Sequence, residues 1–196
     1  GELSIEEMKT DTIIESLKED YIDGGILATP LKEKGIREVN LYFEPFFVYC
    51  HRDHALTQLK KVKINHLSED DVWLLKDGHC LRNQVSALCG TKEGKGAFTN
   101  IFFEGGNLET LRSLIQETRG YTLVPWTFAR RLTKKEQNEC IRPFHHPTPT
   151  RQVSLVYSRD LWKRDIVKAL ETTIKSNLPR DIEIHKKGNT QVIGIE

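Results

Sequence analysis

One apolar stretch limits the folds open to this chain more than any other feature. Residues 38–50 read EVNLYFEPFFVYC, which is too long for one average strand and is interrupted by Pro45. A Pro-rich piece, PFHHPTPT at 143–150, directly precedes a second apolar run, RQVSLVYS at 151–158. We interpret these two places as crossings, where the chain leaves one lobe and later returns to it.

The remaining pattern alternates strand-like and helix-like stretches with short links, which is typical of an α/β fold with mostly parallel strands. The crossings predict a small lobe of residues 44–150, inserted into a lobe made of residues 1–43 plus 151–196. Expected strands cover 2–8, 24–29, 72–76, 97–103, 121–125 and 151–158. Expected helices begin after Asp11 and Thr12, at 80–89, at 108–119 between an Asn107 cap and Gly120, at 126–138, and after an Asp160 cap.

Charge and composition exclude several classes of protein. The 29 basic and 28 acidic residues leave a net charge of +1, without the basic face that phosphate contacts need. No apolar stretch reaches the length of about 18 residues that spans a membrane. We expect the four cysteines to be cytosolic thiols in a cytoplasmic protein. Because Gly1 replaces an initiator Met, we also expect a fragment of a longer polypeptide.

Cys80 lies in the stretch DGHCLRNQVSALC, residues 77–89, at the expected start of a short amphipathic helix. Free N–H groups and the positive end of the helix dipole favour a thiolate there, and only the thiolate is a good nucleophile. His79 and Arg82 add candidate cationic neighbours. The alternative is a buried cysteine that acts as a small apolar side chain.

Cys89 follows Cys80 by nine residues and continues the apolar stripe of Leu81, Val85 and Leu88. Taken alone, it is a packing residue. On one helix the two thiols would be about 13.5 Å apart along the axis, whereas a disulfide needs α-carbons within about 7 Å. A bond between them would require the helix to unwind, which would make the pair a conformational switch.

Other candidate sites are weaker. Zinc sites more often use paired CxxC or HxxxH ligands, and the chain has no GxGxxG, P-loop or GxSxG motif. We therefore predict no metal and no cofactor. The alternative metal ligands are Cys50, His51, His54, Cys140, His145 and His146.

The motif GHCLR, with a second cysteine nine residues after the first, resembles the OxyR family of peroxide-sensing, LysR-type transcription regulators. EMKTDTIIESL, LETLRSL, YTLVP and RQVSLVY agree, and the resemblance covers most of residues 1–172. It implies a LysR-type regulatory domain and not an enzyme, with two Rossmann-like lobes resembling a periplasmic binding protein. By this resemblance, we expect the family's first regulatory strand and helix, and its DNA-binding domain, to be missing from the sequence.

Residue by residue, the resemblance makes Cys80 the peroxidatic cysteine and Cys89 the resolving one. It also implies a peroxide pocket. In that pocket, His79 and Thr10 bind the peroxide, Arg82 rearranges with its loop, and Arg151 stabilises the thiolate.

The resemblance also implies partners. Hydrogen peroxide is the signal, and the outer side of the 108–119 helix, near Glu109 and Arg112, meets a second subunit. The full-length protein is then a homodimer or tetramer that binds DNA through its missing domain, and RNA polymerase is a candidate partner. Asn83 departs from the family, where many members are acidic, and residues 180–196 have no counterpart.

The sequence thus predicts a sensor that activates antioxidant genes through a reversible Cys80–Cys89 disulfide. Two alternatives stay open. One is a LysR-type regulator that binds a small metabolite between its lobes, with incidental cysteines. The other is a thiol peroxidase, although the chain lacks a CxxC motif.

Overall fold

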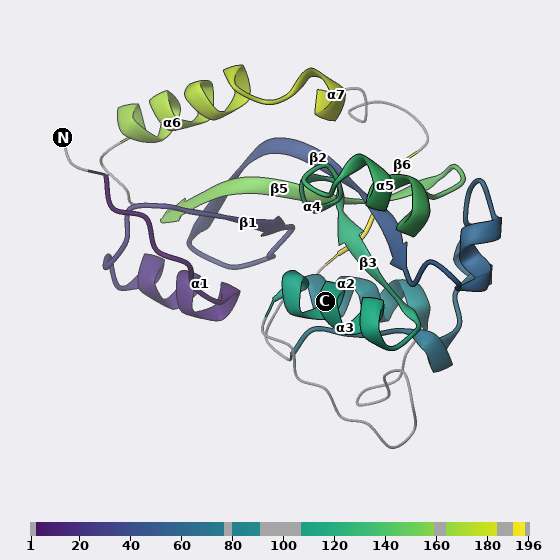
Figure 1. Cartoon of the computed structure of the whole chain (residues 1–196). Coiled ribbons are helices and arrows are strands. Elements are labelled where there is room, and N and C mark those ends of the chain that lie inside the picture. The colour runs from purple at the N-terminus through teal and green to yellow at the C-terminus, as the bar shows by residue number, and fades with distance from the viewer. Residues whose placement is uncertain (1–2, 77–79, 91–106, 159–163, 184–189, 195–196) are drawn as a thin grey trace.

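The computed structural model describes residues 3–76, 80–90, 107–158, 164–183 and 190–194 (Figure 1). The helices are α1 (Thr10–Lys18), α2 (Cys80–Cys89), α3 (Leu108–Glu117), α4 (Trp126–Ala129), α5 (Lys134–Cys140), α6 (Arg164–Ser176) and α7 (Arg180–Glu183). The strands are β1 (Gly25–Thr29), β2 (Ile36–Cys50), β3 (Tyr121–Pro125), β4 (Ile141–Pro143), β5 (Thr148–Ser158) and β6 (Thr190–Val192). Single 3-10 turns occur at Ala55–Gln58, Ile64–His66 and Glu69–Asp71.

β2 is one continuous strand of 15 residues whose partner changes part-way along it. Residues 36–45 pair antiparallel with β5, whereas residues 46–50 pair antiparallel with β3. The change follows Pro45, which has no backbone N–H to donate to a ladder. The apolar run at 38–50 therefore passes from one set of paired strands to another.

The strands are ordered β1-β5-β2-β3, with β4 on β2 and β6 on β5. Every described pairing of these strands is antiparallel except β5 with β6, so the expectation of mostly parallel strands is wrong. The alternation of strands and helices suggested βαβ crossovers. In the structure, the longest strand pairing joins β2 to β5 instead. The chain leaves the β1-β5-β2 strands along β2 and returns along β5, and these two strands run antiparallel.

Three hydrophobic clusters hold these strands between helices. α1 covers one face of the β1-β5-β2 strands and α6 the other, while α2 and α3 lie beside β3 (Figure 1). The cluster under α1 contains Leu17, Leu27, Ile36 and Val156. The cluster under α6 contains Leu41, Leu155 and Val167. The third and largest draws its buried residues from 46–144, with the addition of Ile193. The lobe boundaries at 43/44 and 150/151 stay a prediction.

The N-terminal region differs from the sequence prediction. Residues 3–9 form no strand, and α1 begins at Thr10, so Asp11 and Thr12 are helical residues instead of caps. The N-cap position falls on Lys9, which makes no side-chain capping hydrogen bond. The apolar alternation of Leu3 and Ile5 is not matched by burial, because both side chains are exposed.

Residues 72–76 were expected to be a strand, but the structure has only an isolated parallel bridge between Val72 and Tyr121. Their apolar pattern reflects burial in the largest cluster. Gly120 permits this close approach: its φ is +93°, and a Cβ there would lie 2.5 Å from the Asp71 carbonyl oxygen and 2.9 Å from the Trp73 indole nitrogen.

The predicted helix at 108–119 is confirmed as α3, with Asn107 Oδ1 accepting from the Thr110 amide at 2.9 Å. The predicted helix at 126–138 is broken into α4 and α5. Thr133 causes the break, because its side chain caps α5 by accepting from the Glu136 amide at 3.2 Å.

The strands at 24–29, 121–125 and 151–158 are confirmed as β1, β3 and β5. The expected strand at 97–103 and the Asp160 cap lie outside the described residues. Among the helices that the structure describes, none is long and apolar enough to cross a membrane.

Candidate functional site

Cys80 and Thr10 meet although they are 70 residues apart in sequence. Thr10 Oγ1 lies 2.6 Å from Cys80 Sγ. Thr10 is the first residue of α1 and Cys80 the first residue of α2, so the thiol lies where two helices begin. The hydroxyl and the thiol are within hydrogen-bonding distance at the N-terminal ends of both helices. The structure thus brings together the two residues that the resemblance assigned to a thiol and its peroxide pocket.

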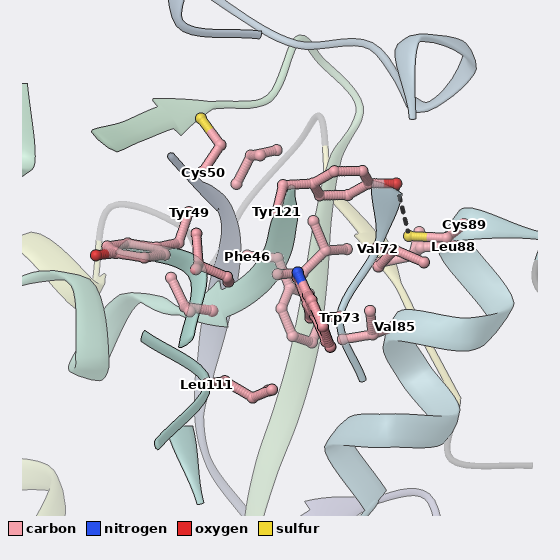
Figure 2. Packing of buried hydrophobic residues seen from close by; sticks show 14 of the residues in the cluster. Phe46, Tyr49, Cys50, Val72, Trp73, Val85, Leu88, Cys89, Leu111 and Tyr121 are labelled. Carbon is pink, nitrogen blue, oxygen red and sulfur yellow. Dashed lines mark hydrogen bonds between the residues drawn. The ribbon is translucent and has the colours of Figure 1, made fainter. Parts of the chain in front are cut away.

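Cys89 ends α2 inside the largest hydrophobic cluster, beside Val85 and Leu88 (Figure 2). The Tyr121 hydroxyl lies 3.5 Å from Cys89 Sγ and also donates to the Ser68 carbonyl oxygen at 2.8 Å. Burial raises the pKa of Tyr121, so its phenol stays protonated. The Cys89 side chain is itself buried and so shielded from solvent.

Neither cysteine forms a disulfide in the structure, and the two occupy the first and last positions of one ten-residue helix. The helix and its buried apolar face confirm the prediction for residues 80–89. At about 1.5 Å per residue the two α-carbons are roughly 13.5 Å apart, about twice the span of a disulfide. The described conformation is therefore that of a dithiol.

Arg82 follows Cys80 on α2, and its guanidinium donates to the Leu75 carbonyl oxygen at 2.8 Å. This bond ties the start of the helix to the buried segment 72–75. His79, the other candidate neighbour of Cys80, lies outside the described residues.

Arg151 forms an ion pair in the structure, and its expected role in stabilising the thiolate stays a prediction. Its Nε donates to Glu44 Oε2 at 2.7 Å, and the Glu44 side chain is fully buried. Glu44 Oε1 also accepts from the Thr127 amide at 2.8 Å. Arg151 thus neutralises a buried carboxylate at the point where β2 and β5 change partners. Glu44 was missed at the sequence level, although a single charge inside the apolar run 38–50 was a usable signal.

Arg112 and Glu109, the expected dimer residues, are both on α3. Arg112 makes a two-pronged ion pair with Glu136 of α5, through Nε at 2.6 Å and Nη2 at 2.8 Å. It also reaches Glu109 at 3.1 Å. Glu136 is buried and accepts from the Tyr49 hydroxyl at 2.8 Å. The Arg112 guanidinium therefore ties α3 to α5 within the chain, while Glu109 remains mostly exposed.

The charge state of this network follows from its contacts. Burial on its own would raise the pKa of Glu136, but the hydrogen bonds from Arg112 and Tyr49 outweigh it and the pKa is lowered. The Glu136 contact also raises the pKa of Arg112. Glu136 is therefore ionised at neutral pH.

The other two cysteines are poor nucleophiles. Cys50 is fully buried, and burial raises its pKa to about 12. Burial also raises the pKa of Cys140. His51 and His54 use their Nδ1 atoms to accept from backbone amides of their own loop. In the part of the chain that the structure describes, no three histidine, cysteine or acidic side chains gather in a metal-binding arrangement.

A family model decides the relationship of this chain to known proteins. Residues 2–179 match the model described as the LysR substrate binding domain. The chain belongs to the LysR substrate-binding domain family. This LysR-type domain is part of a transcription-regulator family and not of an enzyme family, as expected.

Relatives of this LysR-type domain are OxyR-like. The hydrogen peroxide-inducible genes activator of Pectobacterium carotovorum is 28% identical over 186 residues, 95% of this chain and 60% of that protein. The DNA-binding transcriptional dual regulator OxyR of Escherichia coli K12 is 30% identical over 156 residues, 80% of this chain and 50% of that protein. The LysR-type domain thus spans 50–60% of the length of these relatives.

A solved structure agrees with the fold. Reduced OxyR from Porphyromonas gingivalis superposes with a TM-score of 0.81 at 28% identity, covering 96% of this chain and 84% of that one. The LysR-type domain therefore has the mixed α/β fold of OxyR regulatory domains, and LysR-type regulators typically oligomerise and bind DNA.

Proposed function

We propose that this LysR-type domain senses hydrogen peroxide through reversible formation of a Cys80–Cys89 disulfide. The 2.6 Å contact between Thr10 Oγ1 and Cys80 Sγ is the observation that carries the proposal. It places a partly exposed thiol within hydrogen-bonding distance of a hydroxyl at the start of two helices, an environment in which that hydroxyl can donate to a peroxide-reactive thiolate. The second thiol, Cys89, lies at the other end of the same helix.

The reaction needs no oxidant or reductant beyond the two cysteines and the peroxide. The Cys80 thiolate attacks one peroxide oxygen, the O–O bond breaks, and the departing hydroxide takes a proton to become water. Cys80 is left as a sulfenic acid. The Cys89 sulfur then attacks the Cys80 sulfur, the S–S bond forms, and a second water leaves. The two thiols lose two electrons, and one peroxide is reduced to two waters.

The same geometry distinguishes Cys80 from the other thiols. Cys50 and Cys140 are buried with raised pKa values, so little thiolate forms at neutral pH. Cys89 is buried as well, and it reaches Cys80 only if α2 unwinds. Peroxide therefore reaches Cys80 first, and the helix controls the second step.

Unwinding α2 costs free energy, but formation of the disulfide can offset this cost. Two turns of helix forfeit several backbone hydrogen bonds at about 1 kcal/mol each, and they expose Leu81, Val85 and Leu88. The covalent S–S bond offsets this. Cys89 would also leave Tyr121 on β3, and β3 shares the largest cluster with Leu111 and Ile115 of α3. A rearrangement at Cys89 therefore has a packed route to α3.

In this proposal the exposed side of α3, near Glu109, contacts a second subunit, and the change in α2 alters that contact. A DNA-binding domain in the longer, cytoplasmic protein, assembled as a dimer or tetramer, then activates antioxidant genes, with RNA polymerase a candidate partner. The peroxide-inducible names of the relatives support this reading. Arg112 supports the contact indirectly, because it holds α3 against α5.

The test is a search by mass spectrometry for a Cys80–Cys89 disulfide peptide after one equivalent of hydrogen peroxide. We expect that peptide in the wild type and in Cys50→Ser and Cys140→Ser, and its loss in Cys80→Ser. If peroxide oxidises Cys50 or Cys140 first, or if Cys80→Ser leaves transcriptional induction intact, the proposal is wrong.

A further inference from the structure

The last described residues of the chain pack against α2, the helix that carries Cys80 and Cys89. β6 pairs parallel with the start of β5, and the Ile193 amide just beyond β6 donates to the Thr150 carbonyl oxygen at 2.8 Å. The Ile193 side chain is 8% exposed and packs into the cluster that holds α2. We call residues 190–194 the C-terminal strap. At the sequence level this tail had no assigned role.

Gln84 of α2 forms a hydrogen bond with the C-terminal strap. Its Nε2 donates to the Ile193 carbonyl oxygen at 2.9 Å, and its side chain is fully buried. Its Oε1 is buried without a hydrogen-bond partner within the described residues. The strap thus accepts the one described hydrogen bond of this buried amide. Gln84 lies between Cys80 and Cys89, in the turns that a disulfide must unwind.

We infer that the C-terminal strap is a redox-controlled latch, docked on α2 in the dithiol form and released when the Cys80–Cys89 disulfide forms. The inference rests on the proposed function for the disulfide itself. Unwinding α2 carries Gln84 away from the Ile193 carbonyl group and opens the apolar site that Ile193 fills. The strap then keeps only its pairing with the edge of β5.

The latch also links α2 to the crossing strands. The two backbone groups of Ile193 face opposite ways, with the N–H bound to Thr150 on β5 and the C=O bound to Gln84 on α2. Thr150 pairs with Pro45, the residue at which β2 changes partners. A change at α2 therefore reaches the crossing through a single residue of the strap.

Linkage makes the effect reciprocal. If disulfide formation releases the strap, the docked strap must oppose disulfide formation by the same factor. The strap then holds the domain in the dithiol form and makes the disulfide easier to reduce. Weakening the strap should stabilise the disulfide.

The first experiment measures the disulfide-to-dithiol ratio of the full chain in dithiothreitol buffers, where oxidised dithiothreitol takes two electrons and two protons from the cysteines. Gln84→Met keeps length and burial but removes the amide donor, and Ile193→Ala empties the apolar site. We expect each to raise the ratio about fivefold to tenfold, the size of one lost buried interaction. Tenfold corresponds to a potential about 30 mV more negative. Val192→Ala, 42% exposed on β6, should stay within about twofold of wild type.

The second experiment needs no variant in its first arm. The Ile193 amide should be protected from hydrogen exchange in the wild-type dithiol and exchange at least tenfold faster in the disulfide form. In excess reductant, Gln84→Met should also accelerate exchange at Ile193, whether or not the cysteines ever pair.

The outcomes separate the two ideas. If wild-type protein forms no Cys80–Cys89 disulfide, the proposed function fails, and the redox-linked latch fails with it. If the disulfide forms but the Ile193 amide stays protected and the Gln84→Met ratio is unchanged, only the latch is overturned. If both change as stated, the latch is supported.

Discussion

Thr10 is the residue that distinguishes Cys80 from an ordinary helix-start cysteine. Its hydroxyl is the described hydrogen-bond partner of the sulfur, at 2.6 Å. Thr10→Val preserves shape and removes the donor, so we expect Cys80 to react with peroxide about tenfold more slowly, as expected for a lost hydrogen bond to a charged group. The rate is measured by quenching with an alkylating agent at timed intervals and counting modified Cys80.

Thr10→Ser is the matched control, because it keeps the hydroxyl and loses only a methyl group. It should react at nearly the wild-type rate. Equal rates for the Val and Ser variants would show that the hydroxyl does not activate the thiol.

The sequence predicted some site residues and missed others for a physical reason. The helix position of Cys80 and the apolar stripe leading to Cys89 are local patterns, so spacing alone exposed them. Tyr121, Glu44 and Gln84 act through partners 32 to 109 residues away in sequence. No local period encodes such contacts, and only the fold makes them visible.

At the scale of elements, α2 is a structural helix and, in the proposed function, the barrier to disulfide formation. Ala87 is an exposed residue of its last turns. Ala87→Gly lowers helix propensity by about 1 kcal/mol without touching the core, so only the helical dithiol is destabilised. We expect the disulfide-to-dithiol ratio in a fixed thiol buffer to rise about fivefold.

The control is Ala55→Gly, an exposed position in a 3-10 turn away from α2. It should leave the ratio unchanged. A wild-type ratio in Ala87→Gly would mean that α2 does not unwind when the cysteines join.

The tie between α3 and α5 should depend on pH. Because the folded pKa of Glu136 is lowered from 4.5, its contribution is fully present above about pH 4.5. It is lost as pH falls below that value through the folded pKa. Glu136→Gln should cost about 2 kcal/mol of unfolding free energy at pH 7, the worth of hydrogen bonds to a charged group.

Urea unfolding at pH 7 and at about pH 3 measures this difference. The gap between wild type and Glu136→Gln should shrink at the lower pH. A gap that persists at low pH would mean that the carboxylate charge is not what holds the two helices together.

Among the elements, helices with a local stop signal were the easiest to predict. Asn107 and Gly120 bracket α3 in the sequence and in the structure. The apolar stretch at 72–76 was wrongly predicted to be a strand. Its residues are apolar because they are buried, but they form only one bridge to β3. The break between α4 and α5 at Thr133 was missed because a threonine inside a helical pattern is ambiguous until its side chain is seen to cap.

At the scale of the whole molecule, the Arg151–Glu44 pair joins β2 to β5 next to the residue at which β2 changes its pairing partner. Removing Arg151 leaves a fully buried carboxylate without its countercharge. We expect Arg151→Met to lower the unfolding free energy by about 3–5 kcal/mol. Folded Arg151→Met protein should retain the rate at which Cys80 reacts with peroxide.

Arg37→Met is the control, because Arg37 is exposed on the same pair of strands and should change stability little. A selective loss of Cys80 reactivity in Arg151→Met, with stability unchanged, would instead restore the role that the resemblance implied. Urea unfolding and timed alkylation of Cys80 together distinguish the two.

The overall architecture was partly predictable. The length of the run at 38–50 indicated a crossing between lobes. The structure shows a change of partner along β2, and the division into lobes stays a prediction. The direction of the strands was not predictable from alternation, because an outgoing and a returning strand give the same local pattern as successive βαβ units. Direction is a property of the path of the whole chain.

If the two thiols that terminate α2 form the proposed disulfide, the oxidant concentration that triggers the domain depends on residues that never contact the oxidant. Each exposed position of α2 changes the free energy of the helical dithiol by a fraction of a kcal/mol, and thereby that oxidant concentration, while the reacting sulfurs stay the same. Lineages that live under different oxidant levels can thus adjust the oxidant sensitivity of such a domain by small surface substitutions in α2, without changing its chemistry.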